Sequence, residues 1–130
     1  MQLFNRGNAT TFDVPKDRMD GDVVARRFCS ERPDRAMQVV LVEFGAGVQN
    51  VGWHTHSEDQ VLVVTEGRGI VATRDDVVHV TVGDVVECPA GEEHWHGAQE
   101  GSTFAHLSFV PARATPAAWD YDARDDNVTN

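Results

Sequence analysis

Short valine-rich runs, separated by clusters of glycine, aspartate and proline, fill the centre of this sequence from Ala36 to Val110. They recur at a spacing of roughly 8 to 12 residues, which is typical of all-β sandwiches and barrels. Valine favours the pleated surface of a strand, and helical periodicity is absent from this region. The pattern predicts eight strands, at Met37–Phe44, Gly52–His56, Gln60–Glu66, Ile70–Arg74, Val77–Thr81, Val85–Cys88, His94–Ala98 and Thr103–Val110.

The breaks between these runs carry turn-forming residues, so consecutive strands are expected to pair as antiparallel hairpins. A chain of 130 residues has the size of one domain. We therefore predict a single domain over residues 1–130, with a core barrel over about 36–110, an N-terminal arm over 1–35 and a C-terminal tail over 111–130. Val23–Phe28 in the arm is a candidate edge strand, and because edge strands commonly pair two barrels, we expect a homodimer.

The tail begins with a pattern typical of a helix start. Thr115 is a suitable N-cap, and Pro116 would occupy the first helical position. This pattern predicts a short C-terminal helix, running through Trp119, that closes one end of the barrel. We expect the last residues, Asp122–Asn130, to fray.

Charge and composition exclude several classes of partner. The formal net charge is -10 and no cluster of Lys and Arg interrupts the acidic surface, which disfavours binding to nucleic acid or to an anionic membrane. No apolar run approaches the roughly 20 residues that cross a bilayer, and the first residues lack the apolar core of a signal peptide. A cytoplasmic location is therefore expected. Cys29 and Cys88 lie far apart without CxxC spacing, as expected for unreactive thiols in a reducing compartment.

Two histidine pairs, His54-Thr-His56 and His94-Trp-His96, are the source of candidate metal ligands in this sequence. Alternation along a strand places both members of each pair on one face. Imidazole nitrogens bind borderline divalent metals, and an oxygen donor often completes such a set. Gln60 has the matching strand position. His79, an isolated histidine, is instead interpreted as a packed or surface residue.

These groups stand inside two longer motifs that resemble those of the cupin superfamily. The first cupin motif has the form His-x-His-x(3,4)-Glu-x(6)-Gly, and this chain reads GWHTHSEDQVLVVTEG over Gly52–Gly67. The second has the form Gly-x(5)-Pro-x-Gly-x(2)-His-x(3)-Asn, and the chain reads GDVVECPAGEEHWHGA over Gly83–Ala98. The resemblance implies an all-β jelly-roll barrel of antiparallel strands around a metal site. It does not extend to the first 35 or the last 20 residues.

Two positions depart from the motifs. Gln60 stands where the first motif has its glutamate ligand, and Ala98 stands where the second ends in asparagine. Glu58 shares the strand position of Gln60, and Asp59 is adjacent, so either carboxylate could replace the amide if the turn is deformed. The four-residue spacing from His56 favours Gln60.

Gln60, together with HWHGA over His94–Ala98 and the downstream Ala105-His106-Leu107, narrows the resemblance to small cupins that include manganese-dependent hydroxynitrile lyases and partners of carboxymuconolactone decarboxylase-like proteins. This resemblance implies that one divalent ion (Mn, Fe, Zn or Ni) is held by His54, His56, Gln60 and His94. Three imidazoles and an amide add no negative charge, so the site would favour anionic ligands. Sequence does not distinguish among these metals.

Two further histidines, His96 and His106, are candidates for proton transfer. His96 lies about 7 Å along the strand from His94, so we interpret it as a base or as a residue that orients a ligand. His106 shares a strand face with Phe104 and Ser108, and the resemblance places it toward the metal pocket. A histidine near a dication has a lowered pKa, so a neutral His106 would be available as a base near neutral pH. The same position would also suit a histidine that only orients a metal ligand, and both roles stay open.

Three functions fit this site. The first is an enzyme that acts on a small oxygenated molecule by metal-assisted proton transfer, as a lyase or isomerase, with hydroxynitrile cleavage as one instance. The second is a metal-dependent dioxygenase, although an amide at position 60 cannot act as a base. The third is a non-catalytic barrel that binds or senses a small molecule.

Overall fold

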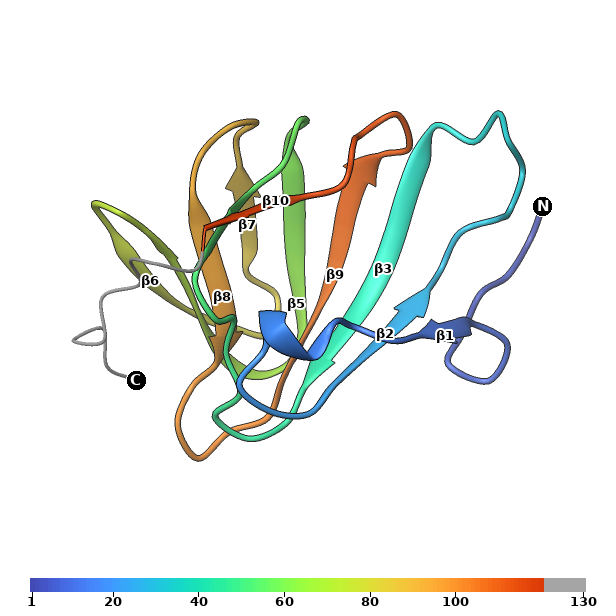
Figure 1. Cartoon of the computed structure of the whole chain (residues 1–130). Helices are drawn as coiled ribbons and strands as arrows, with labels where there is room; N and C mark the ends of the chain where they lie inside the picture. The colour runs from blue at the N-terminus through green and yellow to red at the C-terminus, as the bar shows by residue number, and fades with distance from the viewer. Residues whose placement is uncertain (121–130) are drawn as a thin grey trace.

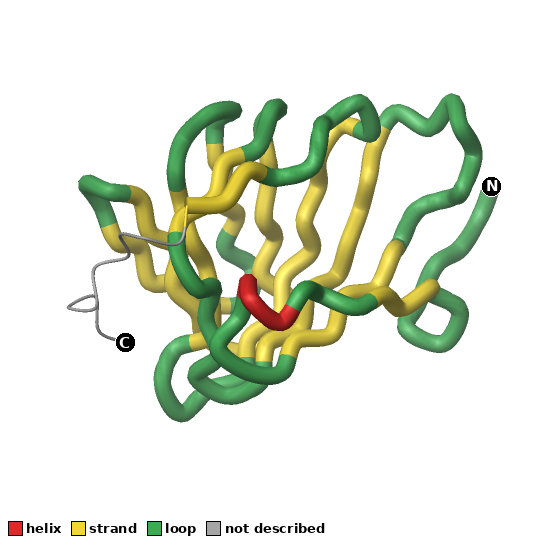
Figure 2. The backbone as a smooth tube through the Cα atoms, viewed as in Figure 1, coloured by secondary structure: helices red, strands yellow, loops and turns green. Residues whose placement is uncertain are grey.

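The computed structural model describes residues 1–120, and nearly all of the regular structure in that part is β-strand (Figures 1 and 2). One turn of 3-10 helix, η1 (Lys16–Arg18), lies in the N-terminal arm. None of the helical structure in this range is long and apolar enough to cross a membrane. The strands are β1 (Thr10–Phe12), β2 (Val23–Arg27), β3 (Met37–Phe44), β4 (Trp53–Thr55), β5 (Gln60–Thr73), β6 (Val77–Thr81), β7 (Val85–Cys88), β8 (His94–Ala98), β9 (Phe104–Pro111) and β10 (Ala118–Asp120).

All the strand pairs are antiparallel, in the order β1-β2-β3-β9-β5-β8-β4-β10, with β6 and β7 paired to β5. Figure 1 shows the resulting sheet curling round so that β3 and β8 stand on different walls of the molecule. The long strand β5 links these walls. Its first half pairs with β7 and β9, and its second half pairs with β6 and β8. The predicted all-β architecture of antiparallel strands is therefore confirmed.

One continuous strand replaces two of the predicted strands. The glycine-rich stretch that predicts a turn between Glu66 and Gly69 lies inside β5, next to a register shift between Val64 and Glu66. At Gly67 the backbone has φ +68°, and a Cβ there would lie 1.8 Å from the carbonyl oxygen of Thr103. Glycine is therefore required for the bend and close approach of β5 to the segment before β9, and not for a reversal of the chain.

The arm contributes two strands. The predicted edge strand forms as β2, but β2 pairs with β3 on one side and β1 on the other. Among residues 1–120, β1 is therefore the strand at this edge of the sheet. All three residues of β1 are exposed.

The predicted C-terminal helix is wrong. The segment Ala118–Asp120 is the strand β10, which pairs with β4, and Trp119 stacks on His54 with ring centroids 4.4 Å apart. A helix of so few residues makes few internal hydrogen bonds for the chain entropy it costs, whereas pairing with β4 also buries an aromatic contact. The expected fraying of Asp122–Asn130 lies outside the described residues.

Two apolar clusters hold the walls. The larger contains Phe44, Leu62, Val64, Val71, Val80, Cys88, Ala98 and Phe104. The smaller contains Trp53, Ile70, Ala72 and Trp95. Both tryptophans of the smaller cluster, Trp53 on β4 and Trp95 on β8, are almost fully buried. Because side chains alternate along a strand, the histidines of β4 and β8 lie on the opposite face from these tryptophans.

Candidate metal centre

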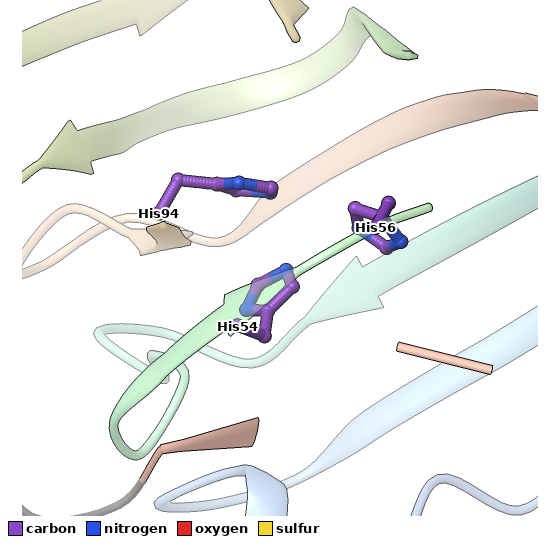
Figure 3. A group of neighbouring side chains, drawn as sticks. All are labelled: His54, His56 and His94. Atoms are coloured by element: carbon purple, nitrogen blue, oxygen red, sulfur yellow. The ribbon is translucent and has the colours of Figure 1, made fainter. Parts of the chain in front are cut away.

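Three histidines from β4, the residue after it and β8 meet in one place. Strand register brings His54 directly opposite His94, and alternation puts His56 on the same face as His54. One ring nitrogen from each histidine lies within 4.8 Å of the others. Figure 3 shows the three rings around a common space. The structure thus places together the three histidines whose spacing suggests metal ligands.

Gln60, at the start of β5, adjoins this cluster. Its Oε1 lies 3.1 Å from Nε2 of His94, and its Nε2 donates to Oγ of Ser108 at 2.8 Å. The other ring nitrogen of His94, Nδ1, lies 3.1 Å from the carbonyl oxygen of Glu92, a contact in which only the ring can donate. Nε2 of a neutral His94 then carries a lone pair that faces the amide oxygen of Gln60.

The two alternative oxygen donors are occupied elsewhere. Both carboxylate oxygens of Glu58 accept hydrogen bonds from Arg113, at 2.7 and 3.3 Å. Asp59 accepts the backbone N–H of Ala90 at 2.9 Å. Neither carboxylate belongs to the group of clustered ligand atoms. Of the three candidate oxygen donors, Gln60 therefore has the position closest to the histidines.

The donor set fits a divalent cation. Nδ1 of His54 and Nε2 of His56 are buried and have no hydrogen-bond partner within residues 1–120. A buried polar atom without a partner is costly, and a metal ion would satisfy it. Imidazole nitrogens with one amide oxygen are suitable ligands for Mn, Fe, Zn or Ni.

Burial keeps these rings neutral. It lowers the pKa of His54 well below its usual value, and the neighbouring rings of His94 and His56 lower it further. Burial, with His94 nearby, lowers the pKa of His56 to about 4. The pKa of His94 is also lowered by burial, against an opposing effect of the Glu92 carbonyl. Each ring therefore has a lone pair available near neutral pH.

A second histidine pair lies beside the cluster. Nε2 of His106 on β9 is 3.2 Å from Nδ1 of His96 on β8, and both rings are buried. Burial lowers the pKa of His106 to about 3, and burial together with the charge of His106 lowers that of His96. The ring centroids of His96 and His54 are 5.1 Å apart, so the pair is in contact with the candidate ligands.

One cavity of about 550 Å³ connects these groups. Four of the histidines reach it, together with Gln60 and Ser108. Val40 and Val42 of β3 give this cavity an apolar wall, whereas Phe44 does not line it and packs against the ring of His106, with ring centroids 5.6 Å apart. A small, partly apolar molecule suits such a cavity.

Sequence reasoning missed the residues that close the cavity. Arg18 and Asp13 from the arm and Trp119 from β10 all line it, yet all three lie outside the cupin motifs. Trp119 alone gave a signal, since a large aromatic residue in a polar tail suggests a packing contact. His79 is exposed on β6, as its isolated position predicts.

Comparison with known families agrees with this architecture. The cupin domain family matches residues 40–110, which is more than half of the chain. The chain belongs to the cupin family. A cupin-like protein from Thermotoga maritima is 29% identical to this cupin, with a TM-score of 0.78 over 96% of this chain and 92% of that chain. A polyketide cyclase from Streptomyces resistomycificus shares the fold, with a TM-score of 0.80 at 18% identity over 96% of this chain and 89% of that chain.

Curated relatives of this cupin are named as two different enzymes, a lyase and a dioxygenase. An (R)-mandelonitrile lyase from Granulicella tundricola is 38% identical over 80 residues, which are 60% of this chain and 60% of that protein. An acireductone dioxygenase from Synechococcus is 37% identical over 110 residues, 82% of this chain and 55% of that protein. The aligned part thus spans less than two thirds of each relative's length.

Proposed function

We propose that this cupin binds one divalent ion and is an enzyme that acts on a small oxygenated molecule by metal-assisted proton transfer. The observation that carries the proposal is the concentration of neutral imidazoles around one cavity, three of them (His54, His56 and His106) with a buried nitrogen that lacks a partner within residues 1–120. The proposed ligands are His54, His56, Gln60 and His94.

The two remaining buried histidines would move the proton. A bound divalent ion supplies positive charge that polarises a carbonyl or hydroxyl oxygen of the substrate. His96 and His106 are neutral, so one ring can accept a proton from the substrate and share it with the other across their 3.2 Å contact. Val40 and Val42 line the same cavity, so an apolar part of the substrate can pack beside the histidine pair.

The similarity to an (R)-mandelonitrile lyase supports hydroxynitrile cleavage as the specific reaction. Removal of the hydroxyl proton by the histidine pair would leave a carbonyl product and release cyanide, which takes up a proton. Three relatives named acireductone dioxygenase support a second candidate, oxygenation of a chelating substrate. Cyanide release and oxygen consumption distinguish the two.

Metal content and turnover test the proposal together. Protein purified without chelator should contain about one divalent ion per chain, and His54→Ala should lose most of it because one imidazole ligand is missing. His79→Ala removes an exposed histidine and should retain the ion. His106→Asn should also retain the ion but lose about 100-fold or more of the cyanide released from mandelonitrile.

Equal metal content in His54→Ala and His79→Ala would contradict the proposed ligand set. Full metal content without cyanide release in the wild type would retire hydroxynitrile cleavage. Oxygen uptake in that case would favour the dioxygenase candidate.

A further inference from the structure

A half-buried arginine reaches the same cavity from the N-terminal arm. Arg18 lies at the end of η1, and its side chain lines the cavity that contains the histidines. Its guanidinium carbon is 5.3 Å from the centroid of the Trp119 ring, and Trp119 in turn stacks on His54. One indole therefore links the arginine to the proposed metal ligands.

This arginine differs from most others in the chain because it has no carboxylate partner among residues 1–120. The sequence has 21 acidic and 11 basic residues, so acidic partners are abundant. Several surface arginines make ion pairs, namely Arg6, Arg26, Arg27, Arg32, Arg74 and Arg113. A partly desolvated guanidinium facing a cavity without a counter-ion favours binding of an anion from solution.

The arrangement of charge in the cavity also favours binding of an anion at Arg18. Within the described chain, Asp13 is the one acidic side chain that lines this cavity, and it is exposed and makes no ion pair with Arg18. Guanidinium groups bind carboxylates through two parallel N–H···O hydrogen bonds, and the contact with the indole of Trp119 helps to hold the Arg18 guanidinium beside the cavity. The cavity thus has a cationic group at one side and neutral imidazoles at another.

We propose that Arg18 anchors a carboxylate of the substrate, so that this cupin carries out the proposed proton transfer on a small organic acid in preference to a neutral hydroxynitrile, with a second oxygen function of the acid at the histidine cluster. The location of that second oxygen rests on the proposed metal-dependent function. The carboxylate anchor itself rests on Arg18, Trp119 and the cavity alone.

Binding of a matched acid and amide tests this substrate class. Mandelate and its neutral amide, mandelamide, should be titrated calorimetrically into the full-length, metal-loaded protein. Arg18→Gln should weaken mandelate binding about tenfold or more, since it removes a hydrogen bond to a charged group, and should leave mandelamide unchanged. Arg18→Lys should recover part of the loss because it restores the charge without the planar fork.

Arg68→Gln is the matched control. It removes the same charge from an exposed arginine on β5 that does not line the cavity, and it should leave mandelate affinity within about twofold of wild type. Thermal unfolding should show all variants folded.

Three results would overturn the proposal: equal affinity of wild type for acid and amide, equal losses in Arg18→Gln and Arg68→Gln, or mandelate affinity that depends on the metal and not on Arg18. The last result would place the carboxylate at the histidine cluster. Absence of turnover would count against the proposed reaction but would leave this binding comparison intact, so the two proposals fail separately.

Discussion

At the scale of single residues, the neutral Gln60 is the feature that distinguishes this site from the usual cupin motif. Gln60→Glu has nearly the same shape and can keep the contact with Ser108, whose hydroxyl would then donate. The new negative charge should tighten divalent metal binding about tenfold, because it attracts the cation within a buried site. Competition with a chelator of known affinity measures the change.

Gln99→Glu provides the comparison for this substitution. It adds the same charge in a loop that does not line the cavity, and it should leave metal affinity nearly unchanged because solvent screens the charge. Similar gains in both variants would indicate a general effect of net charge and would argue against Gln60 as a ligand.

At the scale of elements, β8 is held in place by the loop around Gln49 and Asn50, which runs antiparallel alongside it. Oδ1 of Asn50 accepts the backbone N–H of His96 at 2.9 Å, and a Cβ at Gly97 would lie 2.5 Å from Cα of Gln49. Gly97→Ala should therefore push the loop away from β8 and lower the free energy of unfolding by about 2 kcal/mol or more. Urea unfolding measures this loss.

Gly101→Ala separates crowding from backbone strain. Gly101 has φ +74°, and a Cβ there would meet nothing within 4 Å, so alanine should cost only about 1 kcal/mol of conformational strain. A loss at Gly97 no greater than this would show that the loop yields easily.

The sequence predicts the barrel and the histidine cluster because both depend on local patterns. The pairs His54/His56 and His94/His96 stand at alternate positions of short strands, where side-chain direction follows from position alone. The contributions of Arg18 and Trp119 depend on how the arm and tail fold back over the barrel. No local pattern encodes that packing, and the Thr115-Pro116 helix signal was overridden by pairing with β4.

At the scale of the whole molecule, several histidines buried as neutral rings make stability depend on pH. In the metal-free protein the pKa of His56 is about 4 and that of His106 about 3, both below the usual 6.5. Above pH 6.5 the folded and unfolded chains are both neutral at these rings, so there is no penalty. As the pH falls from 6.5 toward 3, these histidines become protonated in the unfolded chain but stay neutral in the folded chain. The free energy of unfolding therefore declines.

The decline should approach about 1.4 kcal/mol per pH unit for each such histidine. Urea unfolding of chelator-treated protein at pH 7.5, 6 and 5 measures it. His106→Asn should give a shallower decline, whatever its effect on stability at pH 7.5. An equal slope in the variant would contradict burial of a neutral His106.

A cytoplasmic homodimer stays a prediction of the sequence.

The long strand β5 has a consequence for how the molecule comes apart. Its two halves belong to different walls, yet they are one uninterrupted backbone that pairs with β6, β7, β8 and β9. If the strands of one wall separate, β5 loses hydrogen-bond partners, and β5 also pairs with the strands of the other wall. We therefore expect the two walls to unfold together, so that His96 on β8 and His106 on β9 lose their positions in the same step.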